Sequence, residues 1–371
     1  MSEPITMGEL FCGPGGVAVG AGEAARELGM PLKHVWANDI DPDTCQTYRT
    51  NIERMYGDQV LCKNEDVRGL DMSELPDVKG LAFGFPCNDF SRIGKQKGLN
   101  GEFGPLYTYG TKYLAKNKES QADQPEWFFA ENVTGLRSSD DGRTLALIIQ
   151  RLSNAGYDVF PHLYKFEEYG LPQKRHRIIL IGIRKDLQKT FRPPSTDEFP
   201  TMTAREALDR PFPPGVTHNE RTRQSAQVIK RLEAIKEGKN AFNSGLDGDL
   251  KLNIAGATFS NIYRRLTADE PSYTVTGSGG GGTHMYHWKD HRALTNRERA
   301  RLQTFPDDFV FHGTKTSIRK QIGMAVPPEG AKIIFKALFQ TLADQEYKTT
   351  ELNMDEYGNL VAPGLTYAQT L

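Results

Sequence analysis

The stretch ITMGELFCGPGG, residues 5–16, joins an apolar run to a glycine-rich turn. Residues 5–11 have the composition of a buried β-strand. Residues 16–28 carry small apolar side chains at helical spacing. These side chains form one stripe: Ala21, Ala24, Ala25 and Leu28. A strand, a glycine turn and a helix in this order predict the first βα unit of an α/β sheet.

The same alternation continues through the first half of the chain. Asp41 and Pro42 supply an N-cap and the first residue of a second helix. Two apolar segments, 156–166 and 175–184, are expected to pair as strands around a turn at 169–172. Three further strands and one helix are expected, at 34–38, 81–85 and 126–132 and at 107–118. We therefore predict an α/β fold with a doubly wound, mostly parallel sheet.

The regular alternation ends at residue 184. Residues 185–290 are rich in proline, glycine and polar residues and end in TGSGGGGTH (276–284). Order returns in 292–309, where Thr295 and Glu298 form a capping box ahead of Pro306, and in 321–343, where a short turn precedes an amphipathic helix. The sequence thus divides into a first domain, a smaller irregular domain, a return to the first domain and a polar tail: 1–184, 185–290, 291–345 and 346–371.

The composition is typical of a globular, intracellular protein. Of the 371 residues, 38% are hydrophobic and 25% are charged, and the formal net charge is −1. The four cysteines form no C-x-x-C pair, so neither a disulfide framework nor a zinc site is indicated. No apolar run approaches the length of a membrane span, and the N-terminus lacks a signal-peptide pattern. We expect a cytoplasmic protein without a metal or a membrane contact. With a net charge this close to zero, any polyanion must meet basic groups gathered on one face.

Polar residues follow three of the predicted strands at positions suited to a nucleoside. The glycine turn lets the main chain approach a ligand beside the positive end of a helix. Asp39 ends the second strand, where an acid can reach ribose hydroxyls in such folds. Asp66 follows the third strand. Each feature alone also fits an ordinary turn, but together they indicate a nucleoside-binding edge of the sheet.

A second group of reactive side chains follows the later strands. Cys87 lies in GFPCNDFS (84–91), where a strand leaves the sheet, and Glu131 ends the next strand. Arg175 and Arg177 are two residues apart at the start of a further strand, so both are expected to point to one face. A lone cysteine usually packs as a small hydrophobic residue. The combination of a thiol, a carboxyl group and two guanidinium groups favours a chemical role instead.

In these residues the chain resembles the DNA cytosine-5 methyltransferase family. The matching blocks, in order, are FCGPGG, ND, EDV, GFPC-x-x-FS, ENV, QKRxR, RxLTxRExxRLQxFPD and G-x-AVPP. They span residues 10–328 and leave out only the region in which family members differ. The resemblance implies the S-adenosylmethionine-dependent methyltransferase type of sheet, with 185–290 as a target-recognition domain.

The resemblance implies a covalent mechanism. The Cys87 thiolate would add to carbon-6 of a cytosine flipped out of double-stranded DNA. Glu131 would bind ring N3 and the exocyclic amine, Arg175 and Arg177 would favour the thiolate, and Arg177 would reach the base carbonyl. The methyl donor would be S-adenosylmethionine, which leaves as S-adenosylhomocysteine.

The resemblance also implies binding residues. Phe11 would stack on the cofactor adenine, Asp39 would bind the ribose, and Asp66 would contact the adenine amine. The remaining cofactor-binding residues would be Gly13, Gly15, Gly16, Ile40, Val67 and Pro86. The DNA- and base-binding residues would be Phe85, Ser91, Thr274, Gly280 and Gly281, with Thr274 on a backbone phosphate. A flexible linker remains the alternative for the glycine run.

Three departures from the family pattern are Glu9 for Asp, Asn88 for Gln and Met324 for Asn. The alternatives are the related tRNA methyltransferases, an inactive DNA-binding relative and a nicotinamide oxidoreductase. The tRNA branch carries a Cys-Phe-Thr signature, whereas no cysteine follows Cys87 here. We expect a monomeric enzyme that acts on double-stranded DNA, with any cognate restriction endonuclease acting independently.

Overall fold

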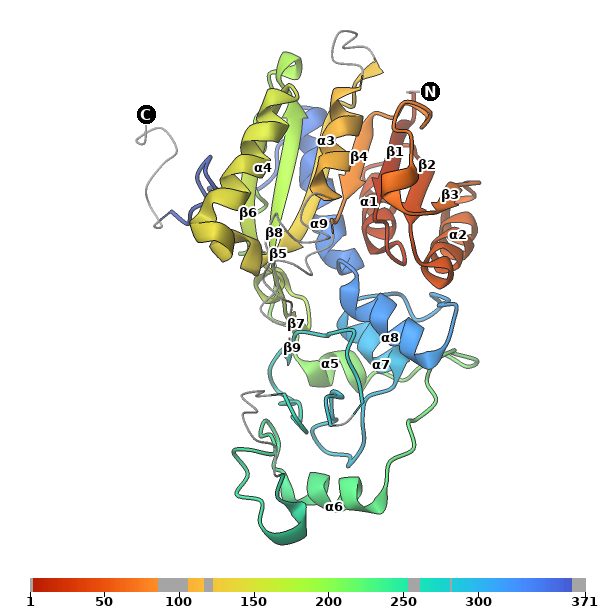
Figure 1. The fold of residues 1–371 in the computed structure, drawn as a ribbon, viewed down its shortest axis with the longest axis vertical. Helices are drawn as coiled ribbons and strands as arrows, with labels where there is room; N and C mark the ends of the chain where they lie inside the picture. Colours follow the sequence, from red (N-terminus) through yellow and green to blue (C-terminus); the bar gives the residue numbers. More distant parts are fainter. Residues whose placement is uncertain (1–2, 86–105, 117–122, 253–260, 281, 362–371) are drawn as a thin grey trace. The chain divides into compact units, whose positions relative to one another are not determined.

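The computed structural model describes residues 3–85, 106–116, 123–252, 261–280 and 282–361 (Figure 1). Four predicted site residues lie outside the described residues: Pro86, Cys87, Ser91 and Gly281. The chain forms two compact units. Unit 1 comprises Met1–Lys165, His176–Glu198 and Gly330–Leu371, and unit 2 comprises Phe166–Arg175 and Phe199–Glu329. Residues 291–329 therefore group with unit 2, whereas the sequence division placed them with the first domain.

Unit 1 is built on a seven-stranded sheet of order β3-β2-β1-β4-β5-β8-β6. The strands are β1 (Ile5–Leu10), β2 (Leu32–Asp39), β3 (Leu61–Asn64), β4 (Gly80–Phe83), β5 (Trp127–Val133), β6 (Tyr157–Lys165) and β8 (His176–Arg184). The pairs up to β5 are parallel, and β8 runs antiparallel to both β5 and β6. The strand order reverses between β1 and β4, which is where open α/β sheets bind ligands. The prediction of a mostly parallel, doubly wound sheet is confirmed.

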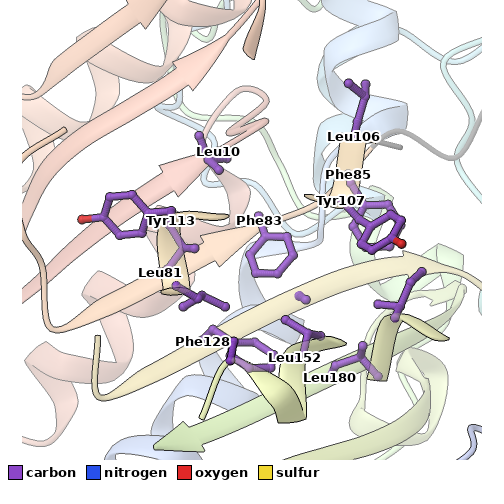
Figure 2. Packing of buried hydrophobic residues seen from close by; sticks show 14 of the residues in the cluster. Leu10, Leu81, Phe83, Phe85, Leu106, Tyr107, Tyr113, Phe128, Leu152 and Leu180 are labelled. Atoms are coloured by element: carbon purple, nitrogen blue, oxygen red, sulfur yellow. The ribbon is translucent and has the colours of Figure 1, made fainter. Parts of the chain in front are cut away.

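Helices cover both faces of this sheet, and the alternation of β5 shows which residues they cover. The helices are α1 (Gly16–Glu27), α2 (Pro42–Tyr56), α3 (Tyr107–Ala115), α4 (Arg143–Asn154) and α9 (Pro328–Leu342). Trp127 and Phe129 pack their rings on Phe335 of α9. Phe128 points the other way, into a core shared with Phe83 and Leu152 (Figure 2). The strand predicted at 126–132 is therefore buried on both faces, as expected of a parallel-sheet strand.

Unit 2 has short elements joined by long irregular segments. They are α5 (Ala204–Leu208), α6 (Ala226–Ala234), α7 (Asn296–Leu302), α8 (Lys315–Met324) and a two-stranded pair of β7 (Gln173–Lys174) with β9 (Ser272–Tyr273). The capping box of Thr295 and Glu298 is confirmed at the start of α7. The sequence prediction of only a short turn at 321 was wrong, because these residues end the ten-residue helix α8, which Thr314 caps.

The polar C-terminal segment packs on unit 1. The Asn353 side chain accepts a hydrogen bond from the Leu163 main-chain N–H at 2.8 Å and donates to the Leu163 carbonyl at 2.9 Å. Met354 next to it is fully buried. Leu163 lies on β6, an outer strand of the sheet. The C-terminal segment therefore covers part of a sheet edge, which its polar composition did not predict. No helix in the described part of the chain is long and apolar enough to cross a membrane.

Candidate active site

The glycine turn between β1 and α1 has a left-handed main chain at three positions. The φ angles are 55° at Phe11, 57° at Gly13 and 101° at Gly15. A Cβ atom on Gly13 would meet nothing within 4 Å, whereas one on Gly15 would lie 3.2 Å from the Tyr48 ring. The turn therefore needs its glycines for conformation, and the described residues leave open space beside Gly13. Gly16, also predicted to bind the cofactor, is the first residue of α1.

Asp39 joins the glycine turn to the end of β2. Its Oδ2 accepts the Gly13 N–H at 3.0 Å, and its Oδ1 accepts the Asp41 N–H at 3.0 Å. Ile40, the next residue, is 64% exposed although its side chain is large and apolar. The structure thus brings Gly13, Asp39 and Ile40 together, as the sequence predicted, at the carboxyl ends of β1 and β2.

Asp66 lies at the corresponding end of β3. Its carboxylate accepts hydrogen bonds from the Arg68 N–H at 2.9 Å and from Arg68 Nε at 3.0 Å. The bond to the Arg68 side chain is the main reason that the pKa of Asp66 is lowered. Val67, predicted to contact the cofactor, is buried as the first residue of the short helical turn that Asp66 caps.

A buried carboxyl group, Glu9, lies under this edge. Only 3% of Glu9 is exposed, and the Tyr48 hydroxyl donates to its Oε2 at 3.2 Å. Burial raises the pKa of Glu9 well above its usual value, and the nearby Asp39 adds to the rise. A Cβ atom on Gly15 would lie 3.2 Å from the Tyr48 ring, so the Glu9–Tyr48 pair lies next to the glycine turn. The sequence marked Glu9 only as a departure from the family, because its burial depends on tertiary packing.

The three described cysteines are free thiols held in the protonated form. Burial raises the pKa of Cys12 to about 12. The pKa of Cys45 is raised by its hydrogen bond with Cys62 and by burial, and that of Cys62 is raised mainly by its hydrogen bond with Cys12. Because only a thiolate is a strong nucleophile, none of these three suits covalent catalysis.

Glu131 and Arg177 meet on one face of the sheet. Arg177 Nε lies 2.7 Å from Glu131 Oε1, and each side chain is only 13% exposed. The Nε–H does not point at this oxygen, so the contact is an ion pair without a formed hydrogen bond. Arg177 Nη1 also donates to the His176 carbonyl at 2.8 Å. The predicted convergence of these two residues is confirmed.

The Glu131 carboxyl group lies beside the end of β4. A Cβ atom on Gly84 would be 3.5 Å from Glu131 Oε2. Asn132, the next residue on β5, donates from its side chain to the Phe85 carbonyl at 3.2 Å. Asn132 is a functional candidate that sequence reasoning missed, although its place in ENV was a signal. It fixes the main chain two residues before Cys87.

Phe85 lies in the hydrophobic core and not on a surface. It is 3% exposed, and its ring centroid is 6.0 Å from that of Tyr107 and 6.4 Å from that of Phe83 (Figure 2). Its predicted role at the base stays a prediction, because a ring this deeply buried offers almost no surface for direct contact.

Arg175 is separated from Arg177 by a break in the strand. The predicted strand 175–184 begins at His176, and Arg175 belongs to unit 2. Its guanidinium donates to three main-chain carbonyls of unit 2, at 3.1 Å to Val275, 3.2 Å to Gly323 and 2.8 Å to Ala325. The expectation that Arg175 and Arg177 share one strand face was wrong, because strand alternation does not extend across this break.

The predicted DNA-binding segment follows β9 in unit 2. The Thr274 hydroxyl donates to the Lys174 carbonyl at 2.7 Å. The main chain then runs along α8, where a Cβ atom on Gly323 would lie only 2.0 Å from the Gly277 nitrogen. Gly280 has a φ of 129° and open space around it. The described part of the glycine run is thus packed on a helix, unlike a free linker.

No group of three or more His, Cys, Asp or Glu side chains suited to a metal ion occurs among the described residues. The polar groups at the sheet edge are instead a carboxylate–guanidinium pair and main-chain donors around a glycine turn. This set suits a nucleoside and a heterocyclic base, which are bound by hydrogen bonds and stacking.

Comparison with known proteins identifies the family. The family model described as C-5 cytosine-specific DNA methylase matches residues 5–340. The Type II methyltransferase M.BbvI of Brevibacillus brevis is 50% identical over 361 residues, which cover 94% of each chain. The Type II methyltransferase M.NgoFVII of Neisseria gonorrhoeae is 38% identical over 354 residues, which cover 93% of this chain and 88% of that protein.

Solved structures agree on the fold. A crystal structure described as a DNA modification methyltransferase from an E. coli prophage covers 91% of this chain and 99% of its own, with a TM-score of 0.64 and 23% identity. The Dnmt2 methyltransferase of S. pombe has a TM-score of 0.53 and 17% identity over 92% of this chain and 98% of its own. At these identities the likeness shows the fold alone, so the family rests on the sequence matches. The chain belongs to the C-5 cytosine-specific DNA methylase family and is a DNA (cytosine-5-)-methyltransferase.

Proposed function

We propose that this enzyme transfers a methyl group from S-adenosylmethionine to carbon-5 of a cytosine flipped out of a specific double-stranded DNA sequence. Cys87 would be the nucleophile that forms a transient bond to carbon-6. The observation that carries the proposal is the position of Glu131, which is paired with Arg177 and faces Gly84, three residues before Cys87.

The chemistry follows from the weak nucleophilicity of carbon-5. The Cys87 thiolate adds to carbon-6, and the electron pair of the ring double bond moves toward carbon-5 while Glu131 stabilises the protonated N3. Carbon-5 then takes the methyl group. Loss of the carbon-5 proton to a base re-forms the double bond and expels the Cys87 thiolate.

Glu131 needs a fixed orientation for this task, and Arg177 supplies it. A carboxyl group that contacts both N3 and the exocyclic amine must present its two oxygens in the plane of the base. The ion pair at Oε1 restrains the carboxyl group, while Oε2 faces Gly84. We infer that Arg177 both orients Glu131 and provides positive charge near the thiolate.

The edge at β1 and β2 fits S-adenosylmethionine, which when bound supplies an electrophilic methyl group. Asp39 would accept the ribose hydroxyls, and the exposed side chain of Ile40 offers an apolar surface for the adenine. The open space at Gly13 lets the methionine part approach the main chain. Phe11, Gly15, Gly16, Asp66, Val67 and Pro86 complete the proposed site.

We propose a structural role for Arg175, whereas its sequence position indicated a catalytic one. Its bonds to Val275, Gly323 and Ala325 suit a residue that holds unit 2 together. A direct effect on the thiolate remains a prediction. Ser91, Thr274, Gly280 and Gly281 are proposed to contact the DNA, with Thr274 at a backbone phosphate.

The names of the relatives support a role in restriction–modification. Both relatives described above are Type II methyltransferases. We infer that this enzyme, acting as a monomer in the cytoplasm, methylates the site of a cognate endonuclease that works independently.

Trapping with 5-fluorocytosine tests the proposal. The fluorine on carbon-5 cannot leave as a proton does, so the adduct persists after methyl transfer. A duplex pool containing 5-fluorocytosine should give a denaturation-stable complex that requires S-adenosylmethionine and is lost in Cys87→Ser. Trapping on RNA but not on DNA, or trapping that survives Cys87→Ser, would contradict it.

A further inference from the structure

The glycine loop, defined here as Thr276–Gly280, is pressed against α8. A Cβ atom on Gly323 would lie 2.0 Å from the Gly277 nitrogen and 2.1 Å from the Thr276 carbonyl carbon, and one on Gly277 would lie 3.1 Å from the Lys320 Cα. The Gly323 distances leave no room for a side chain unless the loop shifts, and the Gly277 distance is tighter than ordinary van der Waals contact. The loop therefore has one fixed inner side, which faces α8.

Two guanidinium groups hold the carbonyls of this loop. Arg299 of α7 donates from Nη1 to the Thr276 and Ser278 carbonyls, each at 3.4 Å. Arg319 of α8 donates from Nη1 to the Gly279 carbonyl at 3.3 Å. The carbonyls of Ser278 and Gly279 are thus directed at buried cations.

The direction of these carbonyls sets the direction of the next amides. In a trans peptide the C=O and N–H groups point to opposite sides. The structure contains no cis peptide among the described residues. The N–H groups of Gly279 and Gly280 therefore point away from Arg299 and Arg319. Neither N–H donates a hydrogen bond to any described residue. Two adjacent main-chain donors with no acceptor are suited to an anionic oxygen.

The two arginines carry charge that the described fold does not neutralise. Arg299 is fully buried, and its Nε and Nη2 have no hydrogen-bond partner among the residues that the structure describes. Neither Arg299 nor Arg319 forms an ion pair with a described carboxylate. By contrast, Arg301 on the same helix α7 pairs with Asp307 at 2.6 Å. Burial and the charge of Arg319 lower the pKa of Arg299 to about 10, so it stays charged at neutral pH.

We propose that Arg299 and Arg319 are positioning residues that turn the Gly279 and Gly280 N–H groups toward a DNA backbone phosphate. The inference rests on the proposed action on double-stranded DNA. The phosphate accepts hydrogen bonds from the two amides and supplies negative charge near the two guanidinium groups, for which the described residues of unit 2 offer no carboxylate in ion-pair distance. Arg299 lies at an unspecified position of the family motif RxLTxRExxR, so the motif itself does not assign it a role.

This arrangement separates folding from binding. A buried guanidinium with unpaired donors costs folding free energy, and an apolar residue of similar length removes that cost. Arg299→Met should therefore not lower the melting temperature, yet it should weaken DNA binding about 10-fold. The slope of log K against log salt should fall by about 0.9, because one phosphate contact is lost. Arg299→Lys keeps the charge and should restore most of that slope.

The experiment uses the full chain and a short duplex that carries a site methylated by the wild-type enzyme. Such a site is found by bisulfite sequencing of DNA from cells that express it. Anisotropy titrations over a range of KCl concentrations give the DNA affinity, calorimetry gives the S-adenosylmethionine affinity, and a melting curve reports the fold. Lys315→Met is the matched control, since it removes a positive charge from the exposed start of α8, where Lys315 faces Glu220 at 3.6 Å. It should leave the DNA affinity within twofold of wild type.

An amide-to-ester replacement at Gly280, made by translation in vitro with glycolic acid, removes only the N–H and should weaken DNA binding severalfold. If Arg299→Met and the Gly280 ester variant both bind DNA with wild-type affinity, the inference is overturned. A melting temperature that falls together with both affinities would assign Arg299 a merely structural role and would also overturn it. If wild-type enzyme fails to trap 5-fluorocytosine DNA, the proposed function fails; if it traps normally while Arg299→Met binds DNA normally, only this inference fails.

Discussion

Glu131 on β5 and Arg177 on β8 form a diagonal pair across two antiparallel strands. Glu131 lies opposite Ile179 in the register, and Arg177 is two residues before Ile179, so both side chains leave the same face of the sheet. Arg177 Nε is 2.7 Å from Glu131 Oε1. Two strands of one rigid sheet thus set the carboxyl group in place, and loop closure is not needed to bring the two residues together.

This pair predicts two different losses of activity. Glu131→Gln keeps the shape but cannot stabilise a protonated N3, so the rate of methyl transfer should fall by about 10²–10⁴-fold. Arg177→Met leaves the carboxyl group in place without its restraint and should give a smaller loss. Transfer of a radiolabelled methyl group to a substrate duplex measures both rates. Near-normal turnover in Glu131→Gln would mean that another acid does the work.

The thiols differ in predicted reactivity. Cys87→Ser should abolish methyl transfer while S-adenosylmethionine binding persists. Cys45→Ala should retain transfer, because the Cys45 thiol, which donates to the Asp39 carbonyl at 3.3 Å, is held protonated. Transfer assays and calorimetry on both variants make the comparison. The assignment of Cys87 does not survive if Cys87→Ser turns over within tenfold of wild type.

Asp39 should matter to the cofactor through its carboxylate. Asp39→Ala removes the proposed ribose acceptor and also frees the Gly13 N–H, which Oδ2 accepts at 3.0 Å. We expect the affinity for S-adenosylmethionine to fall by about 1–3 kcal/mol, measured by calorimetry. The control is Asp71→Ala, which removes an exposed carboxylate whose hydrogen-bond donors among the described residues are the main chain and hydroxyl of Ser73. Equal affinities in the two variants would exclude Asp39 from the site.

His162 predicts how stability depends on pH. It is 5% exposed, and burial lowers its pKa from 6.5 to about 3. Below pH 6.5 the unfolded chain therefore takes up a proton that the folded protein does not. The effect of His162 on the free energy of unfolding is therefore absent above pH 6.5. As the pH falls from 6.5 toward 3, this effect lowers the free energy of unfolding by up to roughly 3–5 kcal/mol. Urea unfolding at several pH values, compared with His162→Gln, isolates the effect; parallel pH profiles would contradict it.

A side chain at Gly323 should destabilise the protein, because the glycine loop packs directly on this position. Its added methyl group would overlap the Gly277 nitrogen, at 2.0 Å, so Gly323→Ala should destabilise the protein by about 1–3 kcal/mol. Gly69→Ala is the control, since its Cβ would meet nothing within 4 Å. Thermal unfolding compares the two, and melting temperatures that agree within error would show that the loop can move off α8.

The sequence predicted unit 1 well, because its elements are encoded locally. The apolar runs of β1, β2 and β5 and the Asp41–Pro42 helix start depend on neighbouring residues alone. The features that it missed depend on distant contacts. Arg175 leaves the strand because its guanidinium finds carbonyls at 275, 323 and 325, and no periodicity reports such partners. The start of α8 could have been recognised from Thr314, which caps it.

The candidate site was predictable in part for the same reason. Asp39 ends β2 and Glu131 lies near the end of β5, and both strands belong to the parallel part of the sheet, so strand direction alone places the two residues at its carboxyl edge. The burial of Glu9 and of Phe85 comes from the packing of Tyr48 and Tyr107, which lie far away in sequence. The roles of Cys87, Pro86, Ser91 and Gly281 stay predictions, since they lie outside the described residues.

The contact of Asn353 with Leu163 has a consequence for how the protein behaves in concentrated solution. An outer strand with free main-chain donors and acceptors invites a second chain to add its own strand. The Asn353 carboxamide occupies both main-chain groups of Leu163 as a neighbouring strand would. A chain truncated before Asn353 would expose this part of β6, and we expect it to aggregate at concentrations where the full-length enzyme stays dispersed.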